Sequence, residues 1–389
     1  MVNLRCDVYD DSLTVYLRGQ IDSGNSAKIE QAIYDLIDAH DIKSITYDMG
    51  QLEYISSAGL RVILRTGKRL QQQVSIINVP ASVYDVLDMT GFTQMFEVTK
   101  AYRSISVDGC EVVGRGVSGV VYRIDPDTVV KVYYNPDSLS DIKRERDLAR
   151  EAFVQGVPTA IPYDVVRVGE SYGSVFELLD ARSLASLLAA GEMSVEQVAQ
   201  KSVDLLKLIH STEASTRVVP DQRLVAYEWV DALHGHLSEE FIDKLRYLLE
   251  SMPENHHLVH GDFHIKNVMV QNDELLLIDM DTLSWGHPVF EFAFIFGIYV
   301  GFGELDPSII ENFLGLPIEL AHQLWDRMLH LYLGNVDEAT VRSVEEKAMV
   351  LGYARIIRRE IRLQNDDGMI NLACRHLEEL LPKMDTLLF

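Results

Sequence analysis

The chain has 389 residues, and its 59 acidic against 35 basic residues give a formal net charge of −24. Hydrophobic residues make up 47% of the chain, which is enough for ordinary cores and excludes a largely disordered protein. So large an acidic excess argues against binding to nucleic acid or to an anionic membrane, because both need a basic face. At roughly 150 residues per domain, the length predicts two or three domains.

The cysteines and the most apolar segment indicate in which cellular compartment the protein is expected. Cys6, Cys110 and Cys374 lie far apart, so they form neither a disulfide framework nor a clustered metal site, and they indicate a reducing compartment. The first residues contain no apolar run of the kind found in secretory signals. The most apolar stretch, residues 290–302, is shorter than the roughly 20 residues of a spanning helix. We therefore expect a cytoplasmic protein with no membrane segment, in which this stretch is a buried helix.

The first hundred residues alternate between two patterns. Runs rich in β-branched and aromatic residues predict strands over 13–17, 44–48 and 74–79. Apolar residues at helical spacing predict helices that begin near Asn25 or Ser26, that cover Leu60–Leu70, and that cover Val83–Met89 before a stop at Gly91. Strands that alternate with helices over about 100 residues are typical of a compact α/β sandwich.

One junction between a strand and a helix carries two serines, Ser56 and Ser57, followed by Ala-Gly-Leu. Either serine could simply cap the helix, since serine is a preferred N-cap residue. The whole string from Tyr54 to Leu64, with Met89-Thr-Gly-Phe92 downstream, resembles the STAS domain, which is the fold of anti-sigma-factor antagonists. The resemblance covers about residues 3–104.

This resemblance implies a regulatory role for one serine. In STAS proteins the serine three residues before the leucine is phosphorylated by a partner kinase, and Ser57 has that place here. A phosphate would add about −1.5 to −2 charges at a helix start, which favours the helix end but repels a partner. The family usually has Asp where this chain has Ser56, so a domain that binds constitutively or mediates dimerisation stays open. The implied partner is an anti-sigma-type or STAS protein.

The second part of the chain opens with a glycine-rich segment, Gly114-Arg-Gly116-Val-Ser-Gly119, between two β-rich runs. A turn between strands differs from the dinucleotide-binding fingerprint, which opens a helix. Glycines at such a turn let backbone N–H groups approach phosphates. The next strand, Val129–Tyr134, carries Lys131. An isolated lysine there would only be a solvent-facing charge that keeps an edge strand from pairing with other chains. After a glycine-rich hairpin, we interpret it as the lysine that holds the α- and β-phosphates.

The most specific motif runs from His260 through Asp262 and His264 to Asn267, with Asp279 after the next apolar strand. The two histidines have the spacing of a zinc helix, but a glycine follows the first and no glutamate does. Asp262 and Asn267 have the spacing of the Asp-x-x-x-x-Asn catalytic loop, and Asp279 lies where a metal-binding aspartate belongs. We predict that Asp262 orients the acceptor hydroxyl, while Asn267 and Asp279 hold Mg²⁺.

These motifs, with Asp281 and the sequence Pro288-x-x-Glu291-Phe-Ala, resemble the aminoglycoside phosphotransferase and choline kinase group over about residues 107–385. Protein kinases usually have His-Arg-Asp and Asp-Phe-Gly instead. The resemblance implies a bilobal α+β fold of the protein-kinase kind, with a β-rich lobe before a helical lobe.

The same resemblance implies two further nucleotide-binding residues. Among the charged residues of the helix expected over 138–155, it favours Glu145 over Glu151 as the partner of Lys131. It also implies that Glu177, at the end of the last strand of the small lobe, begins the hinge that faces an adenine.

The chain is thus expected to combine a STAS domain over 1–104, a kinase-like β-rich lobe over 105–182 and a helical lobe over 183–389. Its expected function is an ATP- and Mg²⁺-dependent phosphotransferase, with GTP as an open alternative to ATP. The acceptor would be a hydroxyl of a small molecule rather than of a protein, and the acidic charge would suit a cationic one. The alternative is a nucleotide-binding scaffold with little or no turnover in an anti-sigma-type partner-switching pathway.

Overall fold

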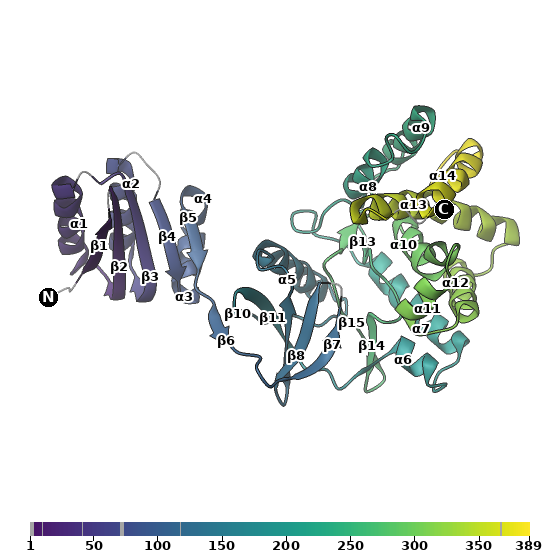
Figure 1. The fold of residues 1–389 in the computed structure, drawn as a ribbon, viewed down its shortest axis with the longest axis horizontal. Coiled ribbons are helices and arrows are strands. Elements are labelled where there is room, and N and C mark those ends of the chain that lie inside the picture. Colours follow the sequence, from purple (N-terminus) through teal and green to yellow (C-terminus); the bar gives the residue numbers. More distant parts are fainter. Residues whose placement is uncertain (1–3, 10, 41, 71–73, 117, 366–367) are drawn as a thin grey trace. The chain divides into compact units, whose positions relative to one another are not determined.

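The computed structural model describes residues 4–9, 11–40, 42–70, 74–116, 118–365 and 368–389. The chain divides into two compact units, the first from residues 1–106 with 165–169 and the second from 107–164 with 170–389 (Figure 1). Each unit contains a hydrophobic core of its own. The domain boundaries expected after residues 104 and 182 stay predictions.

The first unit is built on a five-stranded sheet of order β1-β2-β3-β4-β5, in which β1 is antiparallel to β2 and the other neighbours are parallel. The expected α/β fold class is confirmed. The sheet strands are β1 (Arg5–Tyr9), β2 (Ser12–Ile21), β3 (Ser44–Ile55), β4 (Val74–Val79) and β5 (Glu97–Lys100). The helices are α1 (Ser26–His40), α2 (Ser57–Leu70), α3 (Ala81–Met89) and α4 (Phe92–Met95). A short strand, β6 (Arg103–Ile105), pairs in parallel with β10 (Asp164–Val168).

The core of this unit explains why the expected elements form. Alternate residues of β2, such as Leu13 and Val15, are fully buried, as the period of a strand with one buried face requires. Helix α2 starts very close to the sheet at Gly59. A Cβ atom there would lie 2.7 Å from side-chain atoms of Ile21 and Ile55, so this position admits glycine alone without a shift of its neighbours.

The second unit begins with the β-rich lobe that was expected. Its antiparallel strands follow the order β11-β9-β8-β7, and one helix accompanies them. They are β7 (Glu111–Arg115), β8 (Gly119–Asp125), β9 (Thr128–Tyr133) and β11 (Ser171–Glu177), with α5 (Leu139–Val154). The turn between β8 and β9 is closed by a hydrogen bond from the Asp127 amide to the Asp125 carboxylate at 3.0 Å.

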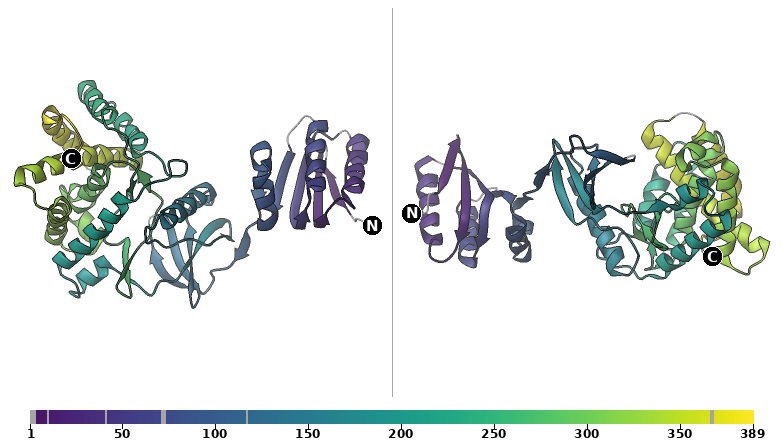
Figure 2. Two further views of the ribbon diagram at one scale, coloured as in Figure 1. Left: turned by 180° about the vertical axis from the view of Figure 1, so that it is seen from behind. Right: turned by 90° about the horizontal axis from the view of Figure 1, so that it is seen from below.

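The rest of the second unit is the expected helical lobe, seen from two further sides in Figure 2. Its helices are α6 (Leu184–Ala189), α7 (Val195–Ser211), α8 (Gln222–Asp231), α9 (Glu239–Glu250), α10 (Val289–Tyr299), α11 (Ser308–Leu314), α12 (Ile318–Leu333), α13 (Glu338–Leu363) and α14 (Met369–Leu380), with 3-10 turns at Gly301–Gly303 and Leu381–Lys383. Two small sheets accompany them: β12 (Arg182–Ser183) with β14 (Val268–Gln271) and β15 (Glu274–Leu277), and β13 (Leu258–Val259) with β16 (Ser284–Trp285).

Helix α10 is the buried helix expected from the apolar stretch. All of its residues except Ile298 are buried, because it runs through the core of the helical lobe and packs along α13. In the described parts of the chain, no helix combines the length and the apolar character needed to cross a bilayer. A capping box starts α7, with Ser194 and Gln197 each accepting a hydrogen bond from the other's backbone amide.

The close approach at Gly59 generates a prediction about the first unit. Gly59→Ala should destabilise that unit by about 1–3 kcal/mol, because the added methyl group overlaps Ile21 and Ile55. Urea unfolding of the full chain can separate the units, since Trp229, Trp285 and Trp325 all lie in the second. We expect circular dichroism to show earlier unfolding while the midpoint by tryptophan fluorescence is unchanged. Ser57→Ala, at an exposed position of the same helix, is the control. Equal unfolding curves for Gly59→Ala and wild type would contradict the prediction.

Candidate active site

Lys131 stands at the centre of a charge cluster between the β-rich and helical lobes. Its Nζ lies 3.1 Å from Glu145 Oε1 of α5 and 3.5 Å from Asp279 Oδ1. Glu151, two turns further along α5, instead accepts a hydrogen bond from the Gln155 side chain at 3.0 Å. The structure therefore contains the Lys131–Glu145 pair that the resemblance implied, and Glu151 takes no part in it.

The cluster is tightened by a tyrosine that the sequence did not single out. Tyr133, two residues beyond Lys131 on β9, donates its hydroxyl to the second oxygen of Glu145 at 2.5 Å. Burial alone would lower the pKa of Lys131, but the carboxylates of Glu145 and Asp279 raise it above its ordinary value. The Lys131 ammonium therefore stays charged throughout the physiological range.

The three glycines of the turn have different environments. A Cβ atom on Gly119, the first residue of β8, would lie 2.2 Å from the Val132 carbonyl oxygen, so the sheet itself requires glycine there. At Gly114 and Gly116 the nearest heavy atoms would be 3.7 and 3.9 Å away, so packing among the described residues does not require these two. The Gly116 amide donates to the Gly119 carbonyl at 2.9 Å and closes the turn.

The loop between β13 and β14 brings Asp262 and Asn267 together. The Asn267 side-chain amide donates to the backbone oxygen of Asp262 at 3.2 Å and to its carboxylate at 3.3 Å. The Asp262 amide donates to Nδ1 of His260 at 3.2 Å, and the Asn267 amide donates to the His264 carbonyl at 2.8 Å. The two predicted residues are thus side by side, and their own loop fixes their positions.

Asp279 follows β15 and completes the group. Its φ of 67° lies in the left-handed region, which is uncommon for a residue other than glycine. The preceding Ile278 amide donates to the Asn267 carbonyl at 3.0 Å, which ties this turn to the catalytic-type loop. Asp279 consequently lies within reach of both Lys131 and the loop that carries Asp262 and Asn267.

The carboxyl group of Asp262 has an unusual electrostatic environment. Burial raises its pKa to about 8, the positive charge of Arg355 opposes that shift, and the carboxylates of Asp279, Asp281 and Glu291 reinforce it. Arg355 comes from α13, nearly a hundred residues further along the chain. No sequence motif identified this arginine, because only the packing of α13 on α10 brings it near the loop.

A second support of the loop is the buried carboxylate of Glu291 in α10. It accepts hydrogen bonds from the backbone amides of His260 at 2.5 Å and Gly261 at 3.0 Å. Burial alone would raise the pKa of Glu291, but the neighbouring His210 and the hydrogen bond from the His260 amide lower it. Glu291 therefore acts here as an ionised acceptor. Its motif had suggested importance, but His210 carried no signal in the sequence.

The histidines around the loop have separate partners and do not converge. His256 and His257 contact Glu254 and Asn255, respectively, at the surface. His264 is buried, which lowers its pKa to about 3 and keeps it neutral, and its Nε2 lies 3.7 Å from the Asp262 carboxylate. Over the described ranges, no cluster of three or more His, Cys, Asp or Glu side chains has the arrangement of a metal site.

The remaining predicted residues are Glu177 in the second unit and Ser57 in the first. Glu177 is the exposed last residue of β11, and the following Leu178 amide donates to the Asp127 carbonyl at 2.8 Å, where the chain leaves the β-rich lobe. In the first unit, Ser56 caps α2: its hydroxyl accepts hydrogen bonds from the amides of Ala58 at 3.2 Å and Gly59 at 3.4 Å. Ser57 is exposed on the first turn of that helix. Its hydroxyl is therefore not the cap.

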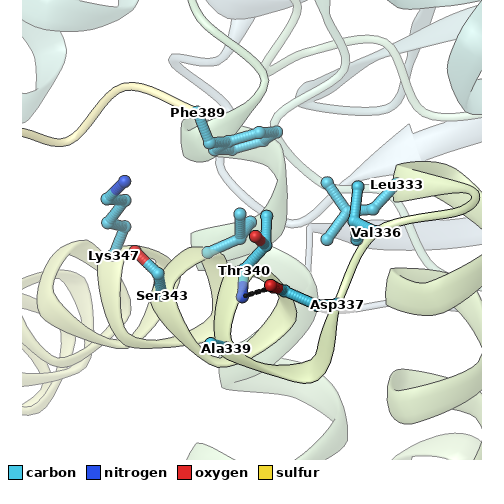
Figure 3. Close-up of a pocket in the computed structure, with 9 residues that line it drawn as sticks. Leu333, Val336, Asp337, Ala339, Thr340, Ser343, Lys347 and Phe389 are labelled. Carbon is cyan, nitrogen blue, oxygen red and sulfur yellow. Dashed lines mark hydrogen bonds between the residues drawn. The ribbon is translucent and has the colours of Figure 1, made fainter.

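A pocket of about 470 Å³ lies elsewhere in the helical lobe, between the end of α12 and the start of α13. Figure 3 shows the Phe389 ring above it and the hydrogen bond from the Thr340 amide to Asp337 that caps α13. The pocket is lined by Leu333, Val336, Asp337, Ala339, Thr340, Ser343, Val344, Lys347 and Phe389. None of the predicted site residues lines it, so it is separate from the candidate active site.

Comparisons with known proteins match the two parts of the chain separately. A family model of the phosphotransferase enzyme family matches residues 109–331, and a STAS domain model matches residues 3–106. The protein named "Putative anti-sigma factor antagonist BtrV" of Bordetella bronchiseptica is 31% identical over 103 residues, which is 26% of this chain and 88% of that protein.

Solved structures of both kinds also match. ADP-bound aminoglycoside phosphotransferase APH(2'')-Ib has 17% sequence identity and a TM-score of 0.47, with 79% of this chain and 99% of that chain covered. The anti-sigma factor antagonist SpoIIAA in its unphosphorylated form has 17% identity and a TM-score of 0.23, with 24% and 86% covered. Because the first family model covers more than half of the sequence and BtrV is matched over most of its length, the chain belongs to the phosphotransferase enzyme family and carries an N-terminal STAS domain.

Proposed function

We propose that this chain transfers the γ-phosphoryl group of a nucleoside triphosphate, with ATP as the expected donor, to a hydroxyl group of a small molecule. The observation that carries the proposal is the convergence of Lys131, Asp262, Asn267 and Asp279 from separate segments into one hydrogen-bonded group. In-line phosphoryl transfer needs positioning and charge neutralisation more than covalent chemistry, and these residues can supply both.

The residues present fit a magnesium ion. The amide nitrogen of Asn267 is engaged by Asp262, so its amide oxygen is the atom left for a cation. Among the described residues, the Asp279 carboxylate contacts only Lys131, at 3.5 Å, which leaves oxygen atoms available for a ligand. Amide and carboxylate oxygens are the donors that Mg²⁺ prefers beside phosphate oxygens. The bound ion would neutralise charge that develops on the transferred phosphoryl group.

Lys131 would hold the α- and β-phosphates, with Glu145 fixing its direction. Asp262 would orient the acceptor hydroxyl and take its proton as the hydroxyl oxygen bonds to the γ-phosphorus. The bond from that phosphorus to the β–γ bridging oxygen then breaks, and the nucleoside diphosphate leaves. Burial raises the pKa of the Asp262 carboxyl above that of an ordinary aspartate, so its ionised form is the stronger base toward the hydroxyl proton.

We further propose that Gly114 and Gly116 leave room for phosphates beneath the turn, and that Glu177 marks the hinge beside the nucleotide base. The absence of any packing need for glycine at positions 114 and 116 supports the first assignment. The position of Glu177 where the chain leaves the β-rich lobe supports the second.

For the STAS domain we propose a regulatory interaction with an anti-sigma-type or STAS protein, in which Ser57 is the phosphoacceptor. The exposed Ser57 hydroxyl on the first turn of α2 supports this assignment, because it is accessible and does not serve as the cap. The competing function is a scaffold that binds nucleotide without turnover. The intact polar group around Asp262 favours the enzyme.

The first functional prediction separates binding from chemistry. Asp262→Ala should abolish phosphate transfer but retain nucleotide binding, whereas Asp279→Ala should weaken Mg²⁺-dependent nucleotide binding itself. Isothermal titration with ATP and Mg²⁺ measures binding, and nucleotide consumption across a panel of amines, sugars and hydroxy acids measures transfer. Transfer at the wild-type rate by Asp262→Ala would show that the catalytic assignment is wrong. Binding without any turnover in wild type would favour the scaffold.

A second prediction concerns the lysine pair. Lys131→Ala should lower the turnover rate by on the order of 10²-fold or more, and Glu145→Ala should have a smaller effect of the same kind. Glu151→Ala on the same helix is the matched control, because Glu151 contacts only Gln155 in this region. Steady-state kinetics of the three variants gives the comparison. A larger loss in Glu151→Ala than in Glu145→Ala would refute the pairing as the functional one.

A third prediction concerns Ser57. If the phosphotransferase part modifies a STAS domain, incubation with Mg²⁺ and ATP should place phosphate on Ser57, and the Asp262→Ala protein should show none. Phosphopeptide mapping by mass spectrometry detects the site, with Ser57→Ala as the control for assignment. An unmodified Ser57 in protein that is consuming ATP would exclude self-modification and leave an external kinase as the source.

A further inference from the structure

Helix α13 carries Arg355 and, about one turn further on, Arg358 and Arg359, both of which have carboxylate partners. Arg358 donates to Glu228 at 3.1 Å, and Arg359 donates to the adjacent Glu360. Among the described residues, no side chain or carbonyl accepts a hydrogen bond from Arg355, and no carboxylate lies within ion-pair distance of it. Arg355 is nevertheless partly buried, where an unmatched guanidinium is costly.

The guanidinium of Arg355 is held against aromatic rings rather than acids. Its central carbon lies 3.9 Å from the centre of the Phe294 ring and 5.7 Å from that of Trp229. Such stacking stabilises a cation through the faces of the guanidinium but leaves the N–H groups at its edge without acceptors. Arg355 is thus fixed in place with its donors available for a ligand.

Two side chains, Phe294 and His264, connect Arg355 to the candidate catalytic aspartate. The Phe294 ring that supports Arg355 also stacks on His264, with ring centres 6.5 Å apart, and His264 is 3.7 Å from the Asp262 carboxylate. Arg355 is also the positive charge that acts most strongly on Asp262. A ligand bound to Arg355 would therefore be next to the place where the acceptor hydroxyl must be.

The helical surroundings of Arg355 associate it with the acceptor rather than with the nucleotide. Helix α13 packs on α8, α10 and α14 in the helical lobe, whereas Lys131 and the glycine-rich turn belong to β7–β9. The acidic net charge of the chain had suggested a cationic acceptor. At physiological ionic strength, however, exposed charges beyond roughly 8 Å are largely screened, so the groups that line the acceptor's place decide its recognition more than the net charge does.

We propose that Arg355 determines acceptor specificity by binding an oxyanion, a carboxylate or phosphate, on the same small molecule that presents the hydroxyl to Asp262. The planar fork of a guanidinium matches both groups through paired hydrogen bonds. This inference rests on the proposed phosphotransferase function, and it replaces the cationic acceptor that the net charge had suggested with a hydroxy acid or a phosphorylated alcohol.

The test uses probes that share one skeleton and differ in charge. Glycerate and glycerol phosphate carry the two oxyanions, glycerol is neutral, and aminopropanediol carries an ammonium group. Each is titrated into the full chain with saturating Mg²⁺ and a non-hydrolysable ATP analogue, which occupies the nucleotide site. Hydrogen bonds to charged groups contribute enough free energy that we expect at least one anion to bind about tenfold or more tighter than glycerol. Comparison of the two anions identifies the preferred oxyanion.

Variants locate the effect. Arg355→Gln should abolish the preference for anions, while Arg358→Gln, on the next turn and paired with Glu228, should preserve it. Arg355→Lys keeps the charge without the fork and serves as the second variant should the glutamine variant fail to fold. Equal binding of all four probes, no binding of either anion, tightest binding of aminopropanediol, or a preference that survives loss of Arg355 would each overturn the proposal.

The design keeps this failure distinct from failure of the proposed function. Binding of the ATP analogue is measured first and alone. If the analogue does not bind, the phosphotransferase assignment is wrong, and the four probes titrated without nucleotide still report on Arg355. Once an anionic acceptor is turned over, Arg355→Gln should raise its KM while the KM for ATP stays constant. An equal fall of kcat for charged and neutral acceptors would instead indicate a role toward the transferred phosphoryl group.

Discussion

The arrangement of the candidate active-site loop depends on one buried carboxylate. Glu291 has no exposed surface, and its two oxygens accept the backbone amides of His260 and Gly261. Hydrogen bonds to an ionised acceptor are among the stronger ones in proteins, and a buried charge that lost them would be severely destabilised. The loop therefore has little freedom just before Asp262. Gly261 adds a steric limit, since its φ is 76° and a Cβ atom would lie 2.7 Å from the Thr282 carbonyl oxygen.

The same helix supports the loop at two more places. Phe294 lies against His264, and the Tyr299 hydroxyl accepts the Ile265 amide at 3.1 Å. Residues 291, 294 and 299 fall on one side of a helix with 3.6 residues per turn, so the α10 backbone sets their relative positions. This accounts for burial all round α10: one side packs in the core, and the other carries the three contacts to the loop.

Local patterns in the sequence predicted what is local in the structure. The spacing from Asp262 to Asn267 and on to Asp279 identified one loop and the turn after the next strand. In the structure Asn267 bonds to Asp262, and the residue before Asp279 bonds to Asn267. Strands β2 to β4 and helices α1 to α3 were also predicted, because their apolar periodicity is strong. Strands β1 and β5 are short and largely exposed, so they left no such pattern. Arg355, His210 and Tyr133 were missed for a different reason. Arg355 and His210 acquire their roles through tertiary packing, and Tyr133 acquires its role through a hydrogen bond to Glu145 on α5. No spacing rule in the sequence encodes those contacts.

The double contact of Lys131 has a consequence for the order of events at this site. One ammonium group links Glu145 in the β-rich lobe to Asp279 in the helical lobe, so without ligands it acts as an electrostatic latch between them. A cation that takes Asp279 competes with that latch, and a polyphosphate that takes Lys131 releases Asp279 for the cation. Each ligand thus breaks the contact between Lys131 and Asp279, which the other ligand would otherwise have to break itself. Metal and nucleotide should therefore bind with positive cooperativity. The direct contact between Lys131 and Asp279 would then be replaced by an indirect link through the bound nucleotide and metal ion.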